Sequence, residues 1–257
     1  MGKLHHLDVG CADCSIITSN NYTFLIDCHS IENFTELLPL NKKIRGVFIT
    51  HQHYDHFDGL SYLKENDYEI SHLIYSPYER RYGDSSVQYE EWNDFIRYRD
   101  YFEKKGTTLH YPYRQTQFDK PWWEIDNLKF FILGPASHIA KADTRELHDA
   151  SLVIHAELGN RKCLFTGDAS DTNLNYISKN ATNICNDILH ASHHGSINGA
   201  DLDFIKACNA KYTVVSTKSG VYENVPSSTA LQRYRSNTKE EVYRTDTDGS
   251  IKWTFTS

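Results

Sequence analysis

The sequence has no apolar run long enough to cross a membrane. Its 257 residues contain no stretch near the ~18 consecutive apolar residues that a membrane-spanning helix needs. The N-terminal residues 1–6 have neither the apolar core nor the cleavage site of a signal peptide, and His6 stands where a myristoylation signal has Ser or Thr. We therefore expect a cytoplasmic protein without membrane contact.

Paired cysteines and positive charge are also scarce. The six cysteines are scattered, and no second close pair joins Cys11 and Cys14 to complete a thiolate zinc site. Without a secretion signal, we expect reduced thiols. Because 34 acidic residues outnumber 27 Lys and Arg, the net charge is −7, which argues against a surface coated in positive charge for long nucleic acids. The net charge does not exclude a local basic groove or a small phosphorylated substrate.

No repeat, low-complexity tract or linker divides the chain, so we expect residues 1–257 to form one domain. Short β-rich segments between turn residues predict strands over residues 5–9, 15–18, 22–27, 44–50, 72–75, 122–125, 128–133, 151–157, 162–166, 187–190, 212–216, 241–245 and 251–255. Helical spacing predicts helices over residues 31–38, 59–64, 89–103, 200–208 and 227–235. This pattern indicates an α/β protein in which two sheets pack face to face with helices outside.

The sequence does contain one dense group of metal-binding side chains. His51-Gln52-His53-Tyr54-Asp55-His56 places three imidazoles and a carboxylate within six residues, directly after the predicted strand 44–50. Zinc accepts both kinds of ligand. The loop is crowded for one tetrahedral ion, which favours two adjacent metals and hydrolysis. A His-rich surface loop is the alternative.

Further side chains of ligand type stand next to later predicted strands. His148 precedes one strand, Asp168 follows another in Phe165-Thr166-Gly167-Asp168, and His193 and His194 follow a third. Each of them alone is compatible with an ordinary polar loop. Together with the first group they supply enough ligands for a two-metal site on a rigid scaffold.

The order of these motifs resembles the metallo-β-lactamase superfamily and is, more narrowly, similar to the hydrolase domains of the ComEC group of DNA-uptake proteins. The shorter motifs that carry the narrower resemblance are Leu7-Asp8-Val9-Gly10, Phe24-Leu25-Ile26-Asp27, Ser151-Leu152-Val153, His193-His194-Gly195-Ser196 and Arg244-Thr245-Asp246-x-x-Gly249. The resemblance implies an αββα sandwich of two mixed sheets with the metals at one edge.

The resemblance also implies a role for each ligand. One Zn²⁺ is bound by His51, His53 and His148, the other by Asp55, His56 and His194, and Asp168 bridges them. Mn²⁺ or Fe²⁺ are alternatives to Zn²⁺. His194 is preferred to its neighbour His193 because the ligand is expected just before the glycine. Asp27 is expected to orient one ligand imidazole.

This sequence departs from the group in three places. Cys11 and Cys14 flank Asp13, where the group usually has Gln and Gly around the Asp. His148 stands where the group often has Asn, which makes the first metal position more complete. Asn224-Val225-Pro226 replaces a His-Pro, and this puts the group's substrate contacts in doubt.

We expect two zinc ions to lower the pKa of a shared water to about 7, so that Asp55 can aim the resulting bridging hydroxide. His193 or Tyr222 would protonate the leaving group. A phosphodiesterase or nuclease acting on nucleic acid or nucleotides is favoured. Interleaved Arg and aromatic residues in residues 75–123 could stack bases and pair with phosphates, or simply form an amphipathic helix.

Two alternatives remain. One is a hydrolase of a small ester, lactone or amide, β-lactams included. The other is a non-catalytic partner module that keeps the metals. The sequence identifies no protein partner.

Overall fold

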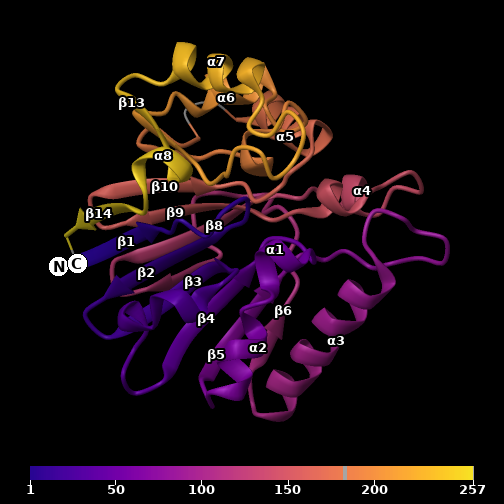
Figure 1. The fold of residues 1–257 in the computed structure, drawn as a ribbon, viewed down its shortest axis with the longest axis vertical. Coiled ribbons are helices and arrows are strands. Elements are labelled where there is room, and N and C mark those ends of the chain that lie inside the picture. The colour runs from indigo at the N-terminus through magenta and orange to yellow at the C-terminus, as the bar shows by residue number, and fades with distance from the viewer. Residues whose placement is uncertain (182–183, 257) are drawn as a thin grey trace.

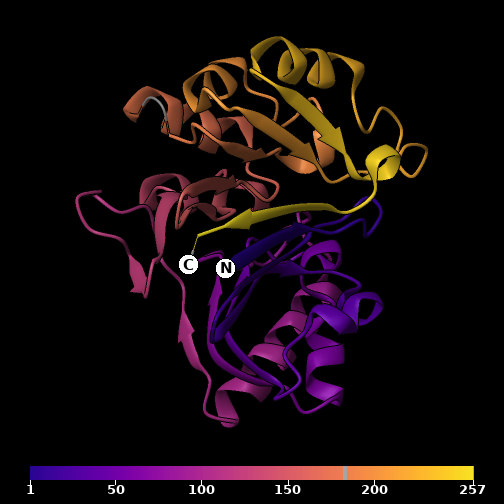
Figure 2. The same ribbon diagram turned by 90° about the vertical axis from the view of Figure 1, so that its left-hand side faces the viewer.

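Two sheets of seven strands each pack face to face in the computed structural model, which describes residues 1–181 and 184–256 (Figures 1 and 2). The first sheet, in spatial order, contains β14 (Ile251–Phe255), β1 (Gly2–His6), β2 (Cys14–Ser19), β3 (Tyr22–Cys28), β4 (Lys43–Ile49), β5 (Glu69–Tyr75) and β6 (Thr108–His110). The second contains β13 (Glu241–Arg244), β12 (Tyr212–Val215), β11 (Ile188–His190), β10 (Arg161–Phe165), β9 (Val153–Leu158), β8 (Leu128–Gly134) and β7 (Trp123–Ile125). Antiparallel pairing of β1 with β14 brings the two marked chain ends together in Figure 2.

Helices cover the outer faces of both sheets. The α-helices are α1 (Tyr54–Phe57), α2 (Leu60–Glu65), α3 (Tyr89–Lys104), α4 (Ser137–Ala140), α5 (Asp171–Asn180), α6 (Leu202–Cys208), α7 (Ser228–Asn237) and α8 (Thr245–Asp248). The 3₁₀ segments are η1 (Ile31–Leu37), η2 (Leu147–Ala150) and η3 (His193–Gly195). Figure 1 shows α1, α2 and α3 beside the first sheet, and α5, α6 and α7 over the second.

Three buried apolar layers alternate with the two sheets. Phe24 and Phe48 of the first sheet meet Phe130 of the second, with ring centroids 5.1 Å apart in both pairs. Phe57 and Phe95 fill the outer layer of the first sheet. Burying each such ring contributes roughly 1.5–3 kcal/mol. The predicted αββα sandwich is therefore confirmed.

The prediction of the first strand was wrong by three residues. The strand covers Gly2–His6 instead of residues 5–9, because it pairs on both sides with β14 and β2. The Phe255 ring occupies the space where a Cβ on Gly2 would lie. Residues 7–13 therefore form a loop, and this loop places Asp13 in the buried interior.

Two helix predictions also need correction. The predicted helix over residues 31–38 is instead the 3₁₀ segment η1 (Ile31–Leu37), which is interrupted at Phe34 by non-helical backbone angles. No side chain caps its start, and Pro39 follows directly after its C-cap residue Leu38. Helix α5 was missed, although the Ser170 side chain caps it by accepting a hydrogen bond from the Asn173 N–H. Among the described helices, none combines the length and the apolar character needed to cross a bilayer.

Candidate metal centre

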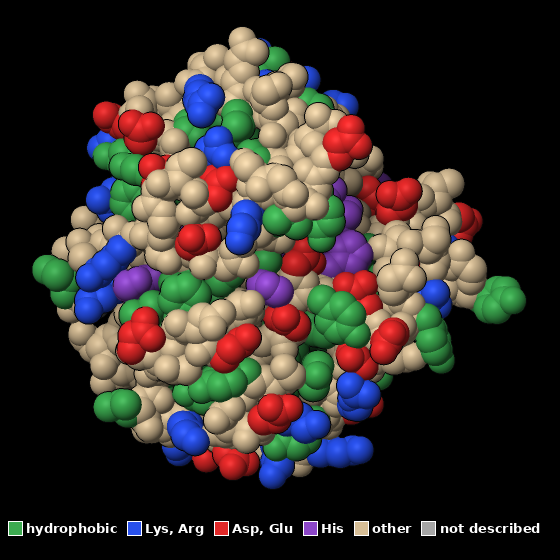
Figure 3. All heavy atoms as spheres, in the orientation of Figure 1, with side chains coloured by type: hydrophobic (Ala, Val, Ile, Leu, Met, Phe, Trp, Pro, Cys, Tyr) green, Lys and Arg blue, Asp and Glu red, His purple; other side chains and the backbone are tan. Residues whose placement is uncertain are grey.

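The predicted ligands meet at one edge of the sandwich because neighbouring strands end there. Strands β3 and β4 are parallel, as are β10 and β11, so the carboxyl ends of each pair lie side by side. Residues 51–56 leave β4, Asp168 follows β10 and residues 193–194 follow β11, while His148 lies in η2 just before β9. In Figure 3, histidine side chains reach the surface between the regions of α1 and α4.

The first histidine cluster has the spacing of a metal site. His51 Nε2 and His148 Nε2 lie 3.2 and 3.4 Å from His53 Nδ1. Ligand nitrogens of a tetrahedral zinc ion are about 3.3–3.4 Å apart, given a Zn–N distance of about 2.0–2.1 Å. The three nitrogens are therefore spaced as if around one ion.

The second cluster contains Asp55, His56 and His194. His194 Nε2 lies 3.3 Å from Asp55 Oδ2, and His56 Nε2 lies 4.0 Å from Asp55 Oδ1. His56 Nε2, His194 Nε2 and Asp168 Oδ1 are buried and have no hydrogen-bond partner among the described residues. Buried polar atoms are rarely left without a partner, so three of them facing one point suit a bound cation.

The Asp168 carboxylate lies between the two clusters. Its Oδ2 is 3.8 Å from His51 Nε2 and 3.9 Å from His148 Nε2. Its Oδ1 is 3.3 Å from His56 Nε2 and 3.6 Å from His194 Nε2. Each oxygen thus faces a different cluster, as expected for a carboxylate shared by two metals.

For four of the ligand imidazoles, a hydrogen bond from the second ring nitrogen explains why the first one points inward. His56 donates from Nδ1 to Asp27 Oδ2 at 2.8 Å, and His51 donates from Nδ1 to Thr50 Oγ1 at 3.3 Å. Thr50 Oγ1 donates in turn to Asp27 Oδ2. In the neutral rings, the nitrogens that remain carry lone pairs toward the clusters, which is the form that a metal requires.

Backbone carbonyls fix two more rings. His53 Nε2 donates to the Ser86 carbonyl at 2.9 Å, and His194 Nδ1 donates to the Ser216 carbonyl at 3.1 Å. These bonds leave His53 Nδ1 and His194 Nε2 as the inward-facing atoms. Two lone pairs 3.2–3.4 Å apart repel each other unless a cation lies between them, so the donor set fits a bound metal.

The histidines of the two clusters differ in their pKa values. Burial lowers the pKa of His51 well below its usual value and that of His148 to about 3. Burial also opposes charge on His194, but Asp168 and Asp55 outweigh it and raise the pKa of His194 to about 10. Likewise, Asp168 and Asp27 raise the pKa of His56 despite its burial. Without metal, His51 and His148 are therefore neutral, whereas His56 and His194 hold protons.

Asp27 lies where the resemblance expects it, at the end of β3 and directly behind His56. It is buried, and its left-handed backbone (φ 53°) lets the carboxylate accept bonds from both Thr50 and His56. We expect Asp27→Asn to weaken metal binding at the second position by roughly 10–100-fold. Chelator competition measures this affinity. Asp58→Asn, a surface carboxylate beside His29, is the control, and equal affinities in both variants would contradict the prediction.

Sequence reasoning missed Asp13 as part of this centre. Asp13 Oδ1 lies 3.6 Å from both His194 Nδ1 and His190 Nε2, and its Oδ2 lies 3.9 Å from His56 Nδ1. The signal was a lone carboxylate within the buried run that leads into β2. His190, which also contacts Ser216 Oγ, was missed as well, because it ends an ordinary apolar strand.

A cavity of about 600 Å³ opens beside the first cluster. His148, His193, Ser170, Glu146 and Asp171 are among its lining residues, and none of the described lining residues is Lys or Arg. Figure 3 shows acidic side chains next to the exposed histidines. Tyr222 is 57% exposed, and burial together with the charge of Asp55 raises its pKa.

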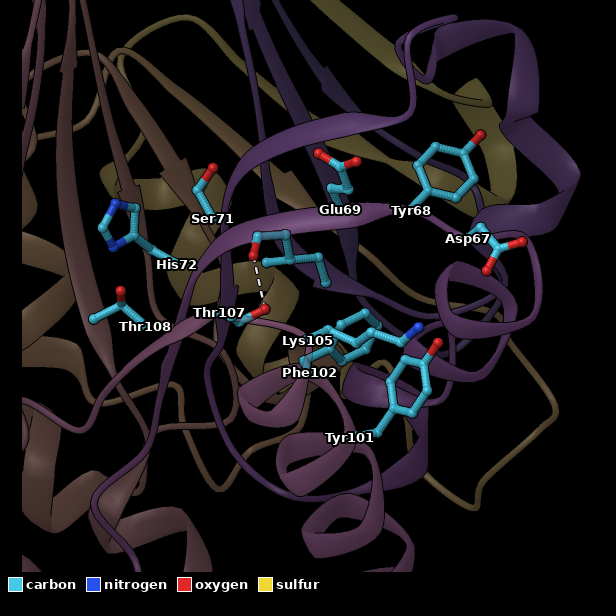
Figure 4. A pocket seen from close by; sticks show the side chains of 12 residues that line it. Asp67, Tyr68, Glu69, Ser71, His72, Tyr101, Phe102, Lys105, Thr107 and Thr108 are labelled. Atoms are coloured by element: carbon cyan, nitrogen blue, oxygen red, sulfur yellow. Dashed lines mark hydrogen bonds between the residues drawn. The ribbon is translucent and has the colours of Figure 1, made fainter.

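A second cavity, of about 530 Å³, lies elsewhere and contains none of these ligands. Figure 4 shows its lining, which comes from the start of β5 and from the segment that joins α3 to β6. Thr107 closes part of it by donating from Oγ1 to the Ile70 carbonyl at 2.7 Å.

Comparison with known structures identifies similar folds at low sequence identity. YhfI from Bacillus subtilis, a metallo-beta-lactamase fold protein, is 12% identical, with a TM-score of 0.60 over 98% of this chain and 100% of that one. CmlA, a diiron beta-hydroxylase from Streptomyces venezuelae, is 13% identical, with a TM-score of 0.59 over 99% of this chain and 54% of that one. Human tRNase Z, short form, is 17% identical, with a TM-score of 0.53 over 99% and 100%.

No curated protein sequence matches the chain. The sequence profile of the Metallo-beta-lactamase superfamily, however, matches residues 8–216, which include all seven predicted ligands. Together with the αββα sandwich and the His and Asp clusters at one edge, this match means that the chain belongs to the metallo-β-lactamase superfamily.

Proposed function

We propose that this protein is a two-metal hydrolase that cleaves a phosphodiester. The observation that carries the proposal is the Asp168 carboxylate, whose two oxygens face two separate groups of imidazole donors. When bound, two divalent ions would supply an acidified water and positive charge for the attacking and leaving oxygens of an in-line displacement. Zn²⁺ suits the donors, and Mn²⁺ or Fe²⁺ remain alternatives.

The residues of the chain have distinct tasks in this proposal. His51, His53 and His148 hold the first ion, and Asp55, His56 and His194 hold the second. Asp168, whose two oxygens face the two clusters, would contribute a ligand atom to each ion. Despite burial, the neighbouring His56 and His194 lower the pKa of Asp55 to about 2, so this carboxylate stays ionised. It can therefore accept a hydrogen bond from the attacking water as well as bind metal.

Tyr222 is the candidate donor of a proton to the leaving group. Its raised pKa keeps the hydroxyl protonated. We expect Tyr222→Phe to lower kcat about 100-fold for a phosphodiester with a poor, alkoxide leaving group. Cleavage of bis(p-nitrophenyl) phosphate should change little, because p-nitrophenolate leaves without a proton. Tyr89→Phe, at an exposed tyrosine beside Arg80, is the control. Equal losses on both substrates would argue against this role.

The surroundings of the metals favour a small substrate over a long nucleic acid. The five arginines of segment 75–123 have partners within the protein. Three of them pair with carboxylates, Arg81 with Asp143, Arg97 with Asp94 and Arg99 with Asp100, and the other two, Arg80 and Arg114, donate to backbone carbonyls. Trp122 and Trp123 pack between the sheets. Since carboxylates line the cavity and none of its described lining residues is cationic, a polyanion would be repelled.

The order of short motifs suggests a closer relation to the ComEC group within the superfamily. Human tRNase Z, by its name, acts on tRNA, and it shares the fold. Neither likeness selects a substrate for this chain, so the phosphodiester proposal depends on the geometry of the two clusters.

The decisive experiment combines metal analysis with a substrate panel. Purified protein should bind about two ions per chain and cleave bis(p-nitrophenyl) phosphate or a dinucleotide in preference to a lactone, a thioester or a β-lactam. Removal of metal by chelation should abolish this cleavage, and re-addition should restore it. Lactone cleavage without phosphodiester cleavage would replace the proposal with its alternative.

That alternative is a hydrolase of a small ester, lactone or amide. The acidic lining of the cavity favours it, because carboxylates such as Glu146 and Asp171 do not repel a neutral substrate. A protein that binds metals and cleaves no member of the panel would point to a non-catalytic module.

A further inference from the structure

The His193 side chain points its Nε2 atom toward the first metal position. Its Nε2 lies 3.7 Å from Asp168 Oδ2, and this oxygen also lies 3.8 Å from His51 Nε2 and 3.9 Å from His148 Nε2. The rings of His193 and His148 are 4.6 Å apart between centroids. His148, Asp168 and His193 together form a further group of donor atoms close enough to share one ion.

The tautomer of His193 is fixed by the backbone. Its Nδ1 donates to the carbonyl of Asn198 at 2.7 Å, so in the neutral ring Nε2 has a lone pair and no hydrogen. A lone pair facing Asp168 Oδ2 at 3.7 Å is repulsive. A cation between the two atoms turns this repulsion into attraction. The arrangement of donors around His193 is thus the same as at the assigned histidines.

The chain holds His193 in an uncommon conformation to achieve this. His193 and His194 both have left-handed backbone angles (φ 51° and 52°), which residues other than glycine seldom adopt. The turn is held by the His193 N–H, which donates to the Gly167 carbonyl, and Gly199 leaves room for the His193 side chain. Strain of this kind typically persists where the site needs it.

We propose that His193 is a fourth imidazole ligand of the first metal position, with His194 serving the second. The proposal rests on the metal binding in the proposed function. The first position then has five protein donors: His51, His53, His148, His193 and Asp168 Oδ2. Because structural and catalytic zinc usually takes four ligands, five donors favour ions that accept five or six, such as Fe²⁺, Mn²⁺ or Co²⁺. The second position, with Asp55, His56, His194 and Asp168 Oδ1, keeps more room for substrate.

Cobalt titration tests the proposal without relying on catalysis. Co²⁺ absorbs visible light weakly with five or six ligands and strongly with four. The first equivalent of Co²⁺ added to metal-free protein should give the weak spectrum. His193→Ala should give a stronger spectrum and roughly 100-fold weaker binding of that equivalent. His138→Ala is the matched control, since His138 lines the same cavity but packs against Tyr176. It should behave like the wild type.

An unchanged cobalt spectrum and affinity in His193→Ala would overturn the proposal. If cleavage of alkyl phosphodiesters were lost at the same time, His193 would be the leaving-group acid instead of a ligand. Should His193→Ala fail to fold, X-ray absorption of wild-type protein with one equivalent of Co²⁺ gives the answer, because four imidazoles are expected and three would contradict it. A wild type that binds no Co²⁺ would reject both this inference and the proposed metal site, whereas binding without hydrolysis would reject the enzymatic proposal alone.

Discussion

Asp168→Asn is expected to cause the largest loss of activity of any single substitution considered for this protein. The amide keeps the shape of the side chain but removes the negative charge that both clusters share. Loss of several kcal/mol of charge stabilisation corresponds to a drop of roughly 10³-fold or more in kcat/KM. Metal content should fall below two ions per chain. The two quantities are measured by elemental analysis and by steady-state hydrolysis of bis(p-nitrophenyl) phosphate.

The matched control is Asp143→Asn, which removes an exposed carboxylate that pairs with Arg81. It should change neither metal content nor kcat/KM by more than about twofold, since exposed pairs contribute only about 0–1 kcal/mol. An Asp168→Asn variant that retained two metals and most of its activity would mean that the carboxylate does not bridge them.

The residues that gather at this edge could be predicted from the sequence because each of them lies shortly before or after a strand. The residues from His51 to His56 are adjacent in sequence, and the others were recognised from their neighbours, such as Gly167 before Asp168. The structure brings all seven predicted ligands together. Periodicity of apolar residues also predicted the sandwich, since its strands are short and separated by turn residues.

The sequence could not show contacts that depend on backbone atoms. Ser86 holds His53, and Asn198 holds His193, through carbonyl groups that any residue possesses. Asp13 reaches His194 because residues 7–13 leave β1 early, and this early end of the strand follows from its pairing with β14 at the far end of the chain. Long-range pairing of this kind leaves no local signal.

Segment 75–123 shows a second limit of prediction from sequence. Its Arg and aromatic residues resemble a nucleic-acid surface in the sequence, but such a list does not tell where the side chains point. In the structure Arg99 pairs with Asp100, and Trp123 packs against Phe24 between the sheets. Pattern alone could not separate a binding wall from a folded core, because both use the same residue types.

Metal binding at the two positions is expected to differ in its dependence on pH. The second position must displace protons from His56 and His194, whose pKa values are raised, to about 10 for His194. At the first position, burial keeps His51 and His148 neutral at pH 7, so they release none. Affinity at the second position should therefore rise roughly tenfold per pH unit for each displaced proton, from pH 7 toward about 10, and affinity at the first should be nearly flat.

Calorimetry in buffers of different ionisation enthalpy counts the protons released at each step. The first equivalent of metal should release few, and the second should release between one and two at pH 7, because the Asp55 and Asp168 carboxylates are already ionised there. In Asp55→Asn, His194 loses a charge partner 3.3 Å away, so its pKa should fall and the release with it. His138→Ala should leave the release unchanged. The carboxylates around His56 and His194 keep these two histidines protonated without metal. Equal proton release in both steps of the wild type would therefore contradict the proposed difference in protonation between the two clusters.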